Sequence, residues 1–456
     1  MAAGPAANDR LPPEIRQALA KAQLPAQALS LWVQQVDATT PRLAHNARQP
    51  VNPASLFKLA TTLAALELLG PHYTWTTPVW LAGPVRQGVL DGSLVLKGSG
   101  DPKLTPERLW LLLRRVQAAG VREISGDIVL DRSAFARPEG RPGDFDGEPL
   151  RPYNVAPDAL LLAQRSLVYT FTPDAARGVA TVSVEPVLDG LKVDAEVPLS
   201  AGTCDDWRAA LAATPADPEQ MRFAGRYPAS CGERAWPLAY PDPASFDARL
   251  LGAMWRELGG RLRGTVRDGS APAGAPSFSV SSPALAEVVR DINKYSNNTM
   301  AQQLFLTLGL TQRGSGSPEA ARAVLRQWLA QAVPEAPADA LVVDNGSGLS
   351  RGARLSAEAM GRLLLRAWRS PLMPELLASL PVAGLDGTTR RSRGAVGRAH
   401  LKTGSLRDVA GVAGIVHGQN GRRWVLVAVL QHPLAGGGRA VLDAAQQWVM
   451  QADAGP

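Results

Sequence analysis

The stretch NPASLFKLATT, residues 52–62, places a serine and a lysine three positions apart where a helix is expected to begin. Asn52 suits the N-cap, and Pro53 suits the first helical position. At this spacing Ser55 and Lys58 share one helix face, and Ser55 lies in the first turn. Backbone N–H groups are free there and the helix dipole is positive, so negative charge on the serine oxygen is favoured.

Lysine is rare in this chain, which makes its position beside Ser55 informative. Of the 48 basic residues, seven are lysine and 48 − 7 = 41 are arginine. Arginine cannot lose its proton in a protein, whereas a partly desolvated lysine can. A neutral Lys58 would be able to take the proton from Ser55. Ser-x-x-Lys is nevertheless a common tetrapeptide, so this motif alone does not identify a nucleophile.

A second polar motif, SNN at residues 296–298, lies between two segments with helical periodicity. A hydroxyl such as that of Ser296 can relay a proton, and the amide of Asn298 can bind a substrate backbone. The alternative is that these residues only cap a helix.

The third motif, LKTGS at residues 401–405, falls on a predicted strand. Lys402 and the hydroxyls of Thr403 and Ser405 are suited to binding a carboxylate, and Gly404 allows a substrate backbone to come close. The alternative is an edge-strand lysine that discourages aggregation.

Together the three motifs follow the order S-x-x-K, S-x-N and K-T-G, and the chain therefore resembles the penicillin-recognising serine enzymes. The gap of 296 − 55 = 241 residues between the first two motifs is similar to that of the D-alanyl-D-alanine carboxypeptidase/endopeptidase family of penicillin-binding protein 4 type, peptidase family S13. The resemblance covers nearly the whole chain. It extends to four further segments: LVLKGSGDPKLT (94–105), GDIVLDRSAF (126–135), DNGSGLSR (344–351) and LPVAGLDGTTRRSR (380–393).

The resemblance implies a mixed α/β (α+β) fold built around a transpeptidase-like catalytic domain, an antiparallel sheet flanked by helices. Residues 1–82 would form its first part and residues 276–456 its second part. Residues 83–275, which are rich in short β-type runs and turns, would form a β-rich insertion. A nested subdomain is expected at about residues 160–243.

The resemblance also implies a serine DD-peptidase that forms an acyl-enzyme. It would remove the terminal D-Ala of stem pentapeptides and cut D-Ala–diaminopimelate cross-links in peptidoglycan, and β-lactams would acylate it. The resemblance implies that Ser55 is the nucleophile, Lys58 the general base and Ser296 a proton relay. For substrate binding it implies that Asn298 binds an amide and that Lys402 and Thr403 bind a carboxylate. The backbone N–H groups of Ser55 and Ser405 would form the oxyanion hole. No glutamate is evidently placed to activate a deacylating water, so the penicilloyl-enzyme is expected to be long-lived.

Recognition of the diaminopimelate side chain is implied for three further positions. Arg351 suits a bidentate contact with a carboxylate, although a structural salt bridge is the alternative for this residue. Tyr153 is the expected aromatic partner, and either Glu148 or Asp146 is expected to bind the side-chain ammonium.

Two cysteines, Cys204 and Cys231, are 27 positions apart. Taken alone they are either two unrelated thiols or one disulfide. The resemblance to a periplasmic family favours the disulfide. The five histidines show no metal-ligand spacing, so neither a metal nor a cofactor is expected.

Charge and hydropathy bear on partners and location. The net charge of +7 comes from dispersed arginines without a basic block, which disfavours nucleic-acid binding. No run of eighteen apolar residues is present, and residues 1–15 lack the apolar core of a signal peptide. Given the resemblance, we expect the mature form of a periplasmic protein, with stem peptides as substrates and β-lactams as covalent inhibitors. Loose wall or membrane association, a homodimer, and the balance of carboxypeptidase and endopeptidase activity are left open.

Two other functions compete with a turning-over peptidase. One is a penicillin-binding sensor or scaffold that is acylated but hardly turns over, and the other is a serine β-lactamase. Release of D-Ala separates the first from a peptidase, and turnover of a β-lactam separates the second.

Overall fold

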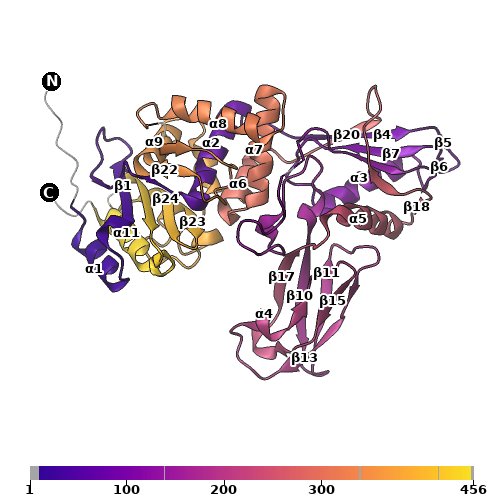
Figure 1. Ribbon diagram of the computed structural model, residues 1–456, viewed down its shortest axis with the longest axis horizontal. Coiled ribbons are helices and arrows are strands. Elements are labelled where there is room, and N and C mark those ends of the chain that lie inside the picture. The colour runs from indigo at the N-terminus through magenta and orange to yellow at the C-terminus, as the bar shows by residue number, and fades with distance from the viewer. Residues whose placement is uncertain (1–9, 138, 338–339, 420, 453–456) are drawn as a thin grey trace. The chain divides into compact units, whose positions relative to one another are not determined.

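The computed structural model describes residues 10–137, 139–337, 340–419 and 421–452 (Figure 1). The chain forms two compact units, Met1–Thr74 with Pro283–Pro456, and Trp75–Ser282. The second unit begins 83 − 75 = 8 residues before the predicted insertion. It ends 282 − 275 = 7 residues after the predicted end of that insertion. The difference arises because the strands at both ends of the insertion, Thr76–Ala82 and Phe278–Ser281, pair with each other in the second unit.

An antiparallel five-stranded sheet organises the first unit, in the order β2-β1-β25-β24-β23. The strands are β1 (Leu29–Gln35), β2 (Leu43–His45), β23 (Ala399–Leu406), β24 (Val409–His417) and β25 (Arg423–Gln431). Strands from the two ends of the chain therefore lie side by side, which confirms the predicted catalytic-domain architecture.

Both faces of this sheet are covered, because side chains alternate along each strand. Leu29, Leu31 and Val33 of β1 join a buried cluster with helices α1 (Pro13–Lys21) and α11 (Arg439–Gln451). Trp32 lies on the opposite face under α9 (Ala357–Trp368), where a Cβ on Gly361 would come within 2.2 Å of the indole ring. A glycine is thus required for α9 to approach the sheet this closely.

Helix α2 (Phe57–Leu69) is buried on every side from residue 57 to residue 66, as expected for a helix that is apolar all round. The other helices of this unit are α6 (Leu285–Tyr295), α7 (Asn298–Arg313), α8 (Pro318–Ala332) and α10 (Met373–Ser379), with 3₁₀ turns η1 (Ala26–Ala28), η2 (Ala54–Leu56), η7 (Gly387–Thr389) and η8 (Ala435–Gly437). A small sheet of β21 (Leu341–Val342), β22 (Arg354–Ser356) and β3 (Pro50–Val51) holds the segment just before η2.

The second unit contains a five-stranded sheet in the order β19-β9-β7-β4-β20 and a four-stranded one in the order β18-β8-β6-β5. Their strands are β4 (Thr76–Ala82), β5 (Val85–Arg86), β6 (Val89–Leu90), β7 (Ser93–Lys97), β8 (Glu123–Ile124), β9 (Ile128–Asp131), β18 (Arg261–Leu262), β19 (Val266–Asp268) and β20 (Phe278–Ser281). Helices α3 (Pro106–Ala118) and α5 (Pro243–Glu257) lie within the segment that was expected to be β-rich.

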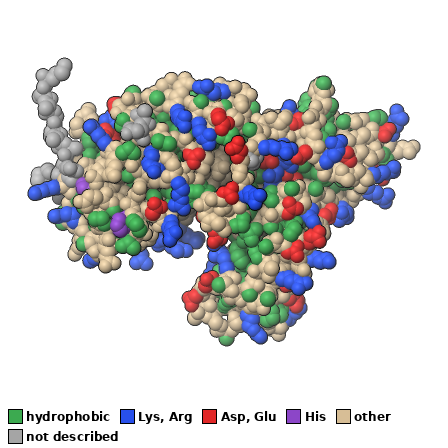
Figure 2. Space-filling view, viewed as in Figure 1, with side chains coloured by type: hydrophobic (Ala, Val, Ile, Leu, Met, Phe, Trp, Pro, Cys, Tyr) green, Lys and Arg blue, Asp and Glu red, His purple; other side chains and the backbone are tan. Residues whose placement is uncertain are grey.

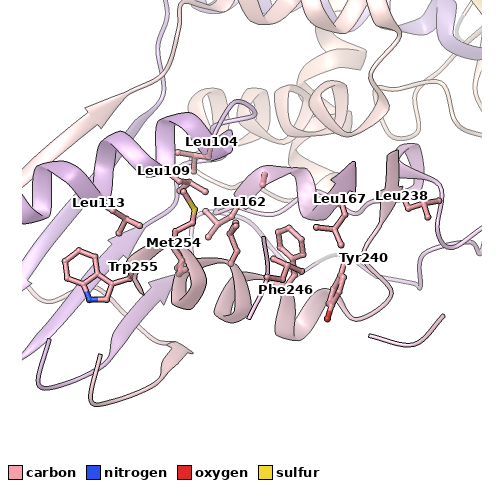
Figure 3. Close-up of a cluster of buried hydrophobic side chains, with 14 of the residues drawn as sticks. Leu104, Leu109, Leu113, Leu162, Leu167, Leu238, Tyr240, Phe246, Met254 and Trp255 are labelled. Carbon is pink, nitrogen blue, oxygen red and sulfur yellow. The ribbon is translucent and has the colours of Figure 1, made fainter. Parts of the chain in front are cut away.

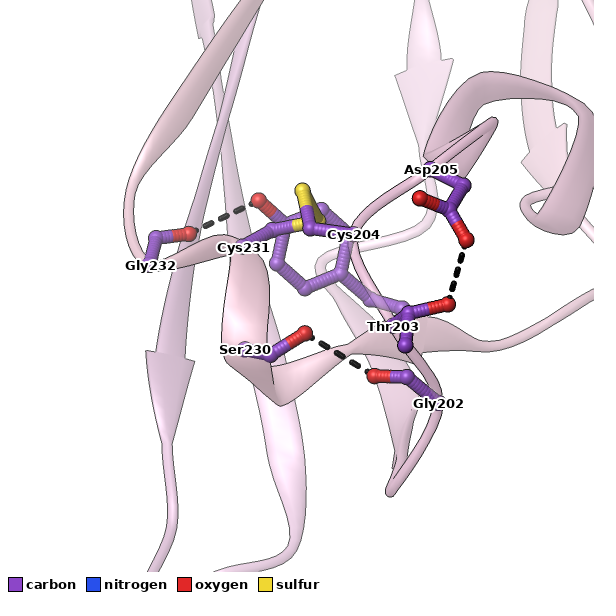
Figure 4. Close-up of a disulfide and its surroundings, with 8 residues drawn as sticks. Gly202, Thr203, Cys204, Asp205, Ser230, Cys231 and Gly232 are labelled. Carbon is purple, nitrogen blue, oxygen red and sulfur yellow. Dashed lines mark hydrogen bonds between the residues drawn. A yellow bond between two sulfur atoms is a disulfide. The ribbon is translucent and has the colours of Figure 1, made fainter.

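Residues 166–239 of the second unit supply two more sheets, in the orders β16-β13-β11-β10-β17 and β12-β15-β14. The elements are β10 (Ser166–Asp174), β11 (Val179–Glu185), β12 (Lys192–Val193), β13 (Glu196–Ser200), α4 (Trp207–Ala210), β14 (Ala213–Thr214), β15 (Gln220–Phe223), β16 (Tyr227–Pro228) and β17 (Arg234–Ala239), with turn η5 (Ala229–Cys231). Turns η3 (Pro152–Asn154) and η4 (Leu162–Arg165) precede this segment. The predicted disulfide between Cys204 and Cys231 is present (Figure 4). Beside it, the Ser230 hydroxyl donates to the Gly202 carbonyl at 2.9 Å and the Tyr227 hydroxyl to the Gly232 carbonyl at 2.8 Å.

One hydrophobic core joins the parts of the second unit. Figure 3 shows side chains from α3, η4, β10, β17 and α5 meeting in a single cluster, among them Leu109, Leu162, Leu167, Leu238 and Phe246. Burying each such side chain is worth about 1.5–3 kcal/mol. The β10 sheet and the α3–α5 layer are thus held together by shared apolar surface.

Candidate active site

Ser55 lies in the η2 turn, which leads directly into α2. The Asn52 carboxamide oxygen accepts a hydrogen bond from the Ala54 N–H at 2.9 Å, and its nitrogen donates to the Ser350 carbonyl at 2.8 Å. The expected N-cap is therefore off by one position: Pro53, not Asn52, is the N-cap of the 3₁₀ turn, and the α-helix starts only at Phe57. Ala54 has a φ of +47°, a left-handed conformation that costs a residue with a Cβ about 1–2 kcal/mol.

The Lys58 side-chain nitrogen is fully buried and lies 2.9 Å from the Ser55 hydroxyl oxygen. It also donates to the Asn298 carboxamide oxygen and to the Ser347 carbonyl oxygen, both at 2.6 Å. Burial, followed by the charge of nearby Lys402, holds the pKa of Lys58 well below its usual value. A neutral amine has two N–H groups and one lone pair. Its two N–H groups match the oxygens of Asn298 and Ser347, which can only accept hydrogen bonds. That lone pair can accept the Ser55 proton.

The Lys402 nitrogen, also fully buried, donates to the Ser296 hydroxyl at 2.8 Å and to the Thr403 carbonyl at 2.7 Å. Burial lowers the pKa of Lys402 to about 7. Ser296 occupies the break between α6 and α7 with a φ of +58°, which turns its side chain out of the helical path. The structure thus connects the second and third motifs directly, as the Lys58–Asn298 bond connects the first and second.

Strand β23 runs close to the nucleophile turn. A Cβ on Gly404 would lie 2.8 Å from the Pro53 carbonyl oxygen and 3.2 Å from the Leu56 nitrogen, so a side chain here would push the strand away. The hydroxyl of Thr403 donates to that of Thr388 at 2.7 Å, and Ser405 is exposed on the same strand. The sequence assigned these strand residues to substrate binding but gave no role to Thr388.

Sequence reasoning also missed the Ser347 carbonyl, because a backbone acceptor leaves no side-chain signature. Its loop is braced by Asn345, whose side-chain oxygen accepts from the Ser347 N–H at 3.1 Å. Gly348 has a φ of +78°, and a Cβ there would lie 1.9 Å from the Ala54 carbonyl oxygen. The two glycines on either side of Ser347 in DNGSGLSR were the available signal.

A second missed feature connects the end of α6 to the segment before β23. The buried Lys294 nitrogen pairs with the Asp386 carboxylate at 2.7 Å, and the other oxygen of Asp386 accepts from the Val382 N–H at 2.7 Å. Gly387 has a φ of +51°, and a Cβ there would lie 2.4 Å from the Lys294 carbonyl oxygen. This contact positions Thr388, and through it Thr403, relative to the helix that ends next to Ser296.

The residues expected to recognise diaminopimelate are divided between the units. Arg351 is in the first unit, with a guanidinium nitrogen 3.6 Å from the Asp408 carboxylate and both side chains about half exposed. In the second unit the Tyr153 hydroxyl donates to Asp146 at 2.9 Å, whereas Glu148 pairs with Arg151 at 3.3 Å.

The pKa values of the Tyr153–Asp146 pair follow from this contact. Burial and the hydrogen bond to Asp146 raise the pKa of Tyr153 to about 12. For Asp146, burial opposes ionisation, but hydrogen bonds from Asn154, Tyr153 and the Glu148 N–H lower its pKa overall. Asp146 is therefore an anion near neutral pH.

Within the residues that the structure describes, no cluster of three or more His, Cys, Asp or Glu side chains is arranged to hold a metal ion. Nor does any described helix combine the length and apolarity needed to span a bilayer.

A serine whose hydroxyl lies beside a buried lysine of lowered pKa, next to a lysine-bearing edge strand, is the arrangement of a serine enzyme of acyl transfer. The chain belongs to the D-Ala-D-Ala carboxypeptidase 3 (S13) family, which it matches over residues 11–451. Over 395 residues it is 31% identical to the D-alanyl-D-alanine carboxypeptidase of Actinomadura sp. (strain R39), covering 81% of this chain and 71% of that protein. It is therefore a serine-type DD-peptidase, a hydrolase of the D-Ala-D-Ala carboxypeptidase class.

Solved structures share the fold. The crystal structure of penicillin binding protein 4 (dacB) from Haemophilus influenzae matches with a TM-score of 0.74 at 21% identity, covering 93% of this chain and 97% of that one. The penicillin G-acylated predatory endopeptidase Bd3459 from Bdellovibrio bacteriovorus, solved with immunity protein Bd3460, matches with a TM-score of 0.50 at 17% identity, covering 92% and 90%.

Proposed function

We propose that this enzyme cleaves the terminal D-Ala of stem peptides through an acyl-enzyme on Ser55, with Lys58 as general base. The observation that carries the proposal is the set of three partners around the Lys58 nitrogen. Two acceptors that cannot donate bind its N–H groups, and the Ser55 oxygen lies 2.9 Å away. Burial keeps the pKa of Lys58 low, so the base is present without a histidine.

In the acylation step the Ser55 oxygen attacks the carbonyl carbon of the penultimate D-Ala, and its proton passes to the Lys58 nitrogen. The backbone N–H groups of Ser55 and Ser405 stabilise the oxyanion, each worth about 2.7–4 kcal/mol of barrier. Ser296, hydrogen-bonded to Lys402, relays the proton that Lys58 has taken up to the leaving amine as the C–N bond breaks. Water then attacks the ester and returns Ser55 to its hydroxyl form.

Substrate is held at both ends of the scissile bond. Lys402 and Thr403 bind the terminal carboxylate, and Asn298 binds the substrate backbone. Gly404 lets strand β23 lie against the nucleophile turn, which supports an arrangement in which the substrate pairs with the outer edge of that strand.

The cross-link-cleaving activity requires recognition of the diaminopimelate side chain. Arg351 binds the carboxylate of the diaminopimelate side chain. Its half-exposed contact with the Asp408 carboxylate is lost when it does so. Of the two acidic candidates in the second unit, Asp146 is favoured over Glu148 for the side-chain ammonium, because Asp146 bonds Tyr153 whereas Glu148 already pairs with Arg151.

The substrate implies action outside the cytoplasm, and we place the enzyme in the periplasm. The net charge of +7 is compatible with loose binding to an anionic wall or membrane surface, and a homodimer is a further proposal.

The test is the intact mass of the protein after incubation with benzylpenicillin, for wild type and Ser55→Ala, followed by peptide mapping. A single long-lived penicilloyl adduct on the Ser55 peptide, absent from the variant, supports the proposal. Release of D-Ala from a diacyl-D-Ala-D-Ala peptide must accompany it. An adduct without D-Ala release would favour a sensor or scaffold, and rapid consumption of penicillin without an adduct would favour a β-lactamase.

A further inference from the structure

The second unit carries a groove of about 910 Å³ between helix α3 and the β10 sheet, and all of its lining residues belong to that unit. The lining is mainly apolar. It includes five prolines, which come from the loop before α3, from α3 itself, from η3, from the segment after β11 and from β17. A groove of this size and composition has the features of a binding site rather than of a packing defect.

The apolar side chains of this groove are exposed to an unusual degree. Leu109, Leu112 and Leu113 already fill the buried face of α3, yet its outer face presents Trp110 and Leu111, which are 43% and 60% exposed. Amphipathic helices carry polar residues at such positions.

Across the groove, Val168 of β10 is 38% exposed and Val187 is 61% exposed. In the space-filling view, hydrophobic side chains gather where the β10 sheet meets the α3–α5 layer (Figure 2). Contiguous exposed apolar surface of this kind marks interaction sites on soluble proteins.

The charges of the lining are of one sign. Its charged residues are Glu107, Glu185 and Glu257, in a protein whose net charge is +7. Glu107 is hydrogen-bonded to Thr105 at the start of α3. The nearby guanidinium of Arg114 lies over the Trp110 ring, 5.7 Å from its centroid, and donates to Gln117. The groove therefore offers apolar surface edged by carboxylates, which is complementary to a basic ligand with apolar side chains.

We propose that this groove binds an extended basic segment of a partner protein. Its aliphatic and proline side chains would lie against Leu111, Val168 and Val187, and its Lys or Arg side chains would pair with Glu185 and Glu257. Strand β17 is an edge of its sheet, but Pro237 has no N–H to offer a further strand, so binding would rest on side chains rather than on strand addition. The lining has one aromatic ring, that of Trp110, among aliphatic and proline side chains, which favours a peptide over a glycan.

The test uses two fluorescein-labelled peptides, KPLPRPLPK and its acidic counterpart EPLPEPLPE, and fluorescence anisotropy with the full chain. The first variant is Leu111→Ser with Val187→Ser. The second is Glu185→Gln with Glu257→Gln, matched by a control that removes the same charge elsewhere, Glu14→Gln with Glu287→Gln. A further control, Leu434→Ser, removes an exposed leucine outside the groove.

We expect saturable binding of the basic peptide only, weakened by sodium chloride. The apolar variant should lose about tenfold in affinity and the carboxylate variant about fivefold, with both controls unchanged. Acylation by benzylpenicillin should be the same in all of these proteins, so the result is independent of the function proposed for Ser55.

Three outcomes would overturn the proposal: no saturable binding of the basic peptide, equal binding of the acidic one, or equal losses in the controls. Binding of chitotetraose that the Leu111→Ser, Val187→Ser variant abolishes, without peptide binding, would assign the groove to a glycan instead.

Discussion

Replacement of Gly348 by alanine tests whether the DNGSGLSR loop sets the base in place. Gly348 has a φ of +78°, and an added Cβ would lie 1.9 Å from the Ala54 carbonyl oxygen, next to the nucleophile. Real Cβ atoms essentially never come within 3.0 Å of another heavy atom, so the loop or the turn must move by about 1 Å or more. The neighbouring Ser347 carbonyl, now 2.6 Å from the Lys58 nitrogen, would move with the loop.

The expected magnitudes follow from this displacement. A misplacement of about 1 Å at a catalytic group costs about 10²-fold in rate, and we expect that loss in the rate of acylation by benzylpenicillin. The left-handed conformation costs alanine a further 1–2 kcal/mol or so, which lowers the melting temperature by about 2–8 °C for a unit of this size.

The assay compares acylation rates, by quenched-flow and intact mass, with thermal unfolding. Gly352→Ala is the matched control, because it lies in the same loop and a Cβ there would meet nothing nearer than the Ser350 hydroxyl at 4.0 Å. Wild-type acylation by Gly348→Ala, or an equal loss in Gly352→Ala, would refute the assignment of the Ser347 carbonyl as a determinant of Lys58 position.

Four further predictions follow from other contacts. Lys58→Arg replaces the base by a permanent charge, and should lower acylation by about 10²–10⁴-fold while benzylpenicillin still binds reversibly. Thr388→Val removes the hydroxyl bonded to Thr403 and should slow acylation by about two- to tenfold without a change in melting temperature. Cys204→Ser with Cys231→Ser opens a loop of 27 residues and should lower the free energy of unfolding by about 3–4 kcal/mol, measured with urea, with acylation retained at low temperature. Burial lowers the pKa of Lys402 to about 7, so unfolding takes up a proton at higher pH. The free energy of unfolding should therefore rise with pH between about 7 and the usual lysine range, by at most about 1.4 kcal/mol per pH unit. This slope should be smaller in Lys402→Met.

The three motifs were predictable from the sequence because each combines a local structural signal with an uncommon residue. Ser55 and Lys58 are close through helix geometry alone, which is visible in a spacing of three. The strand that carries Lys402 alternates and is bounded by turns, so its place in a sheet could be predicted.

Contacts between distant segments could not be predicted in the same way. The Ser347 carbonyl lies 289 positions from Lys58, and Asp386 lies 92 positions from Lys294. Neither pairing has a local pattern, and a backbone oxygen has no residue type to mark it. Helix α3 was missed for another reason: residues 109–113, LWLLL, form a short continuous apolar run, which by itself does not distinguish a helix from a strand.

The scarcity of lysine acquires a physical meaning in the structure. Lys58, Lys294 and Lys402 are buried, whereas the other four lysines are at least partly exposed. The described partners of Lys58 and Lys402 are hydroxyls, a carboxamide and backbone carbonyls, all neutral, so no carboxylate offsets the effect of burial and the pKa of both lysines is lowered.

An arginine in either place would bury a charge that it cannot release. Lys294 differs because the Asp386 carboxylate faces it at 2.7 Å, so it can remain an ammonium and join two segments. For a buried lysine, the charge of its partner therefore decides between proton transfer and structural support.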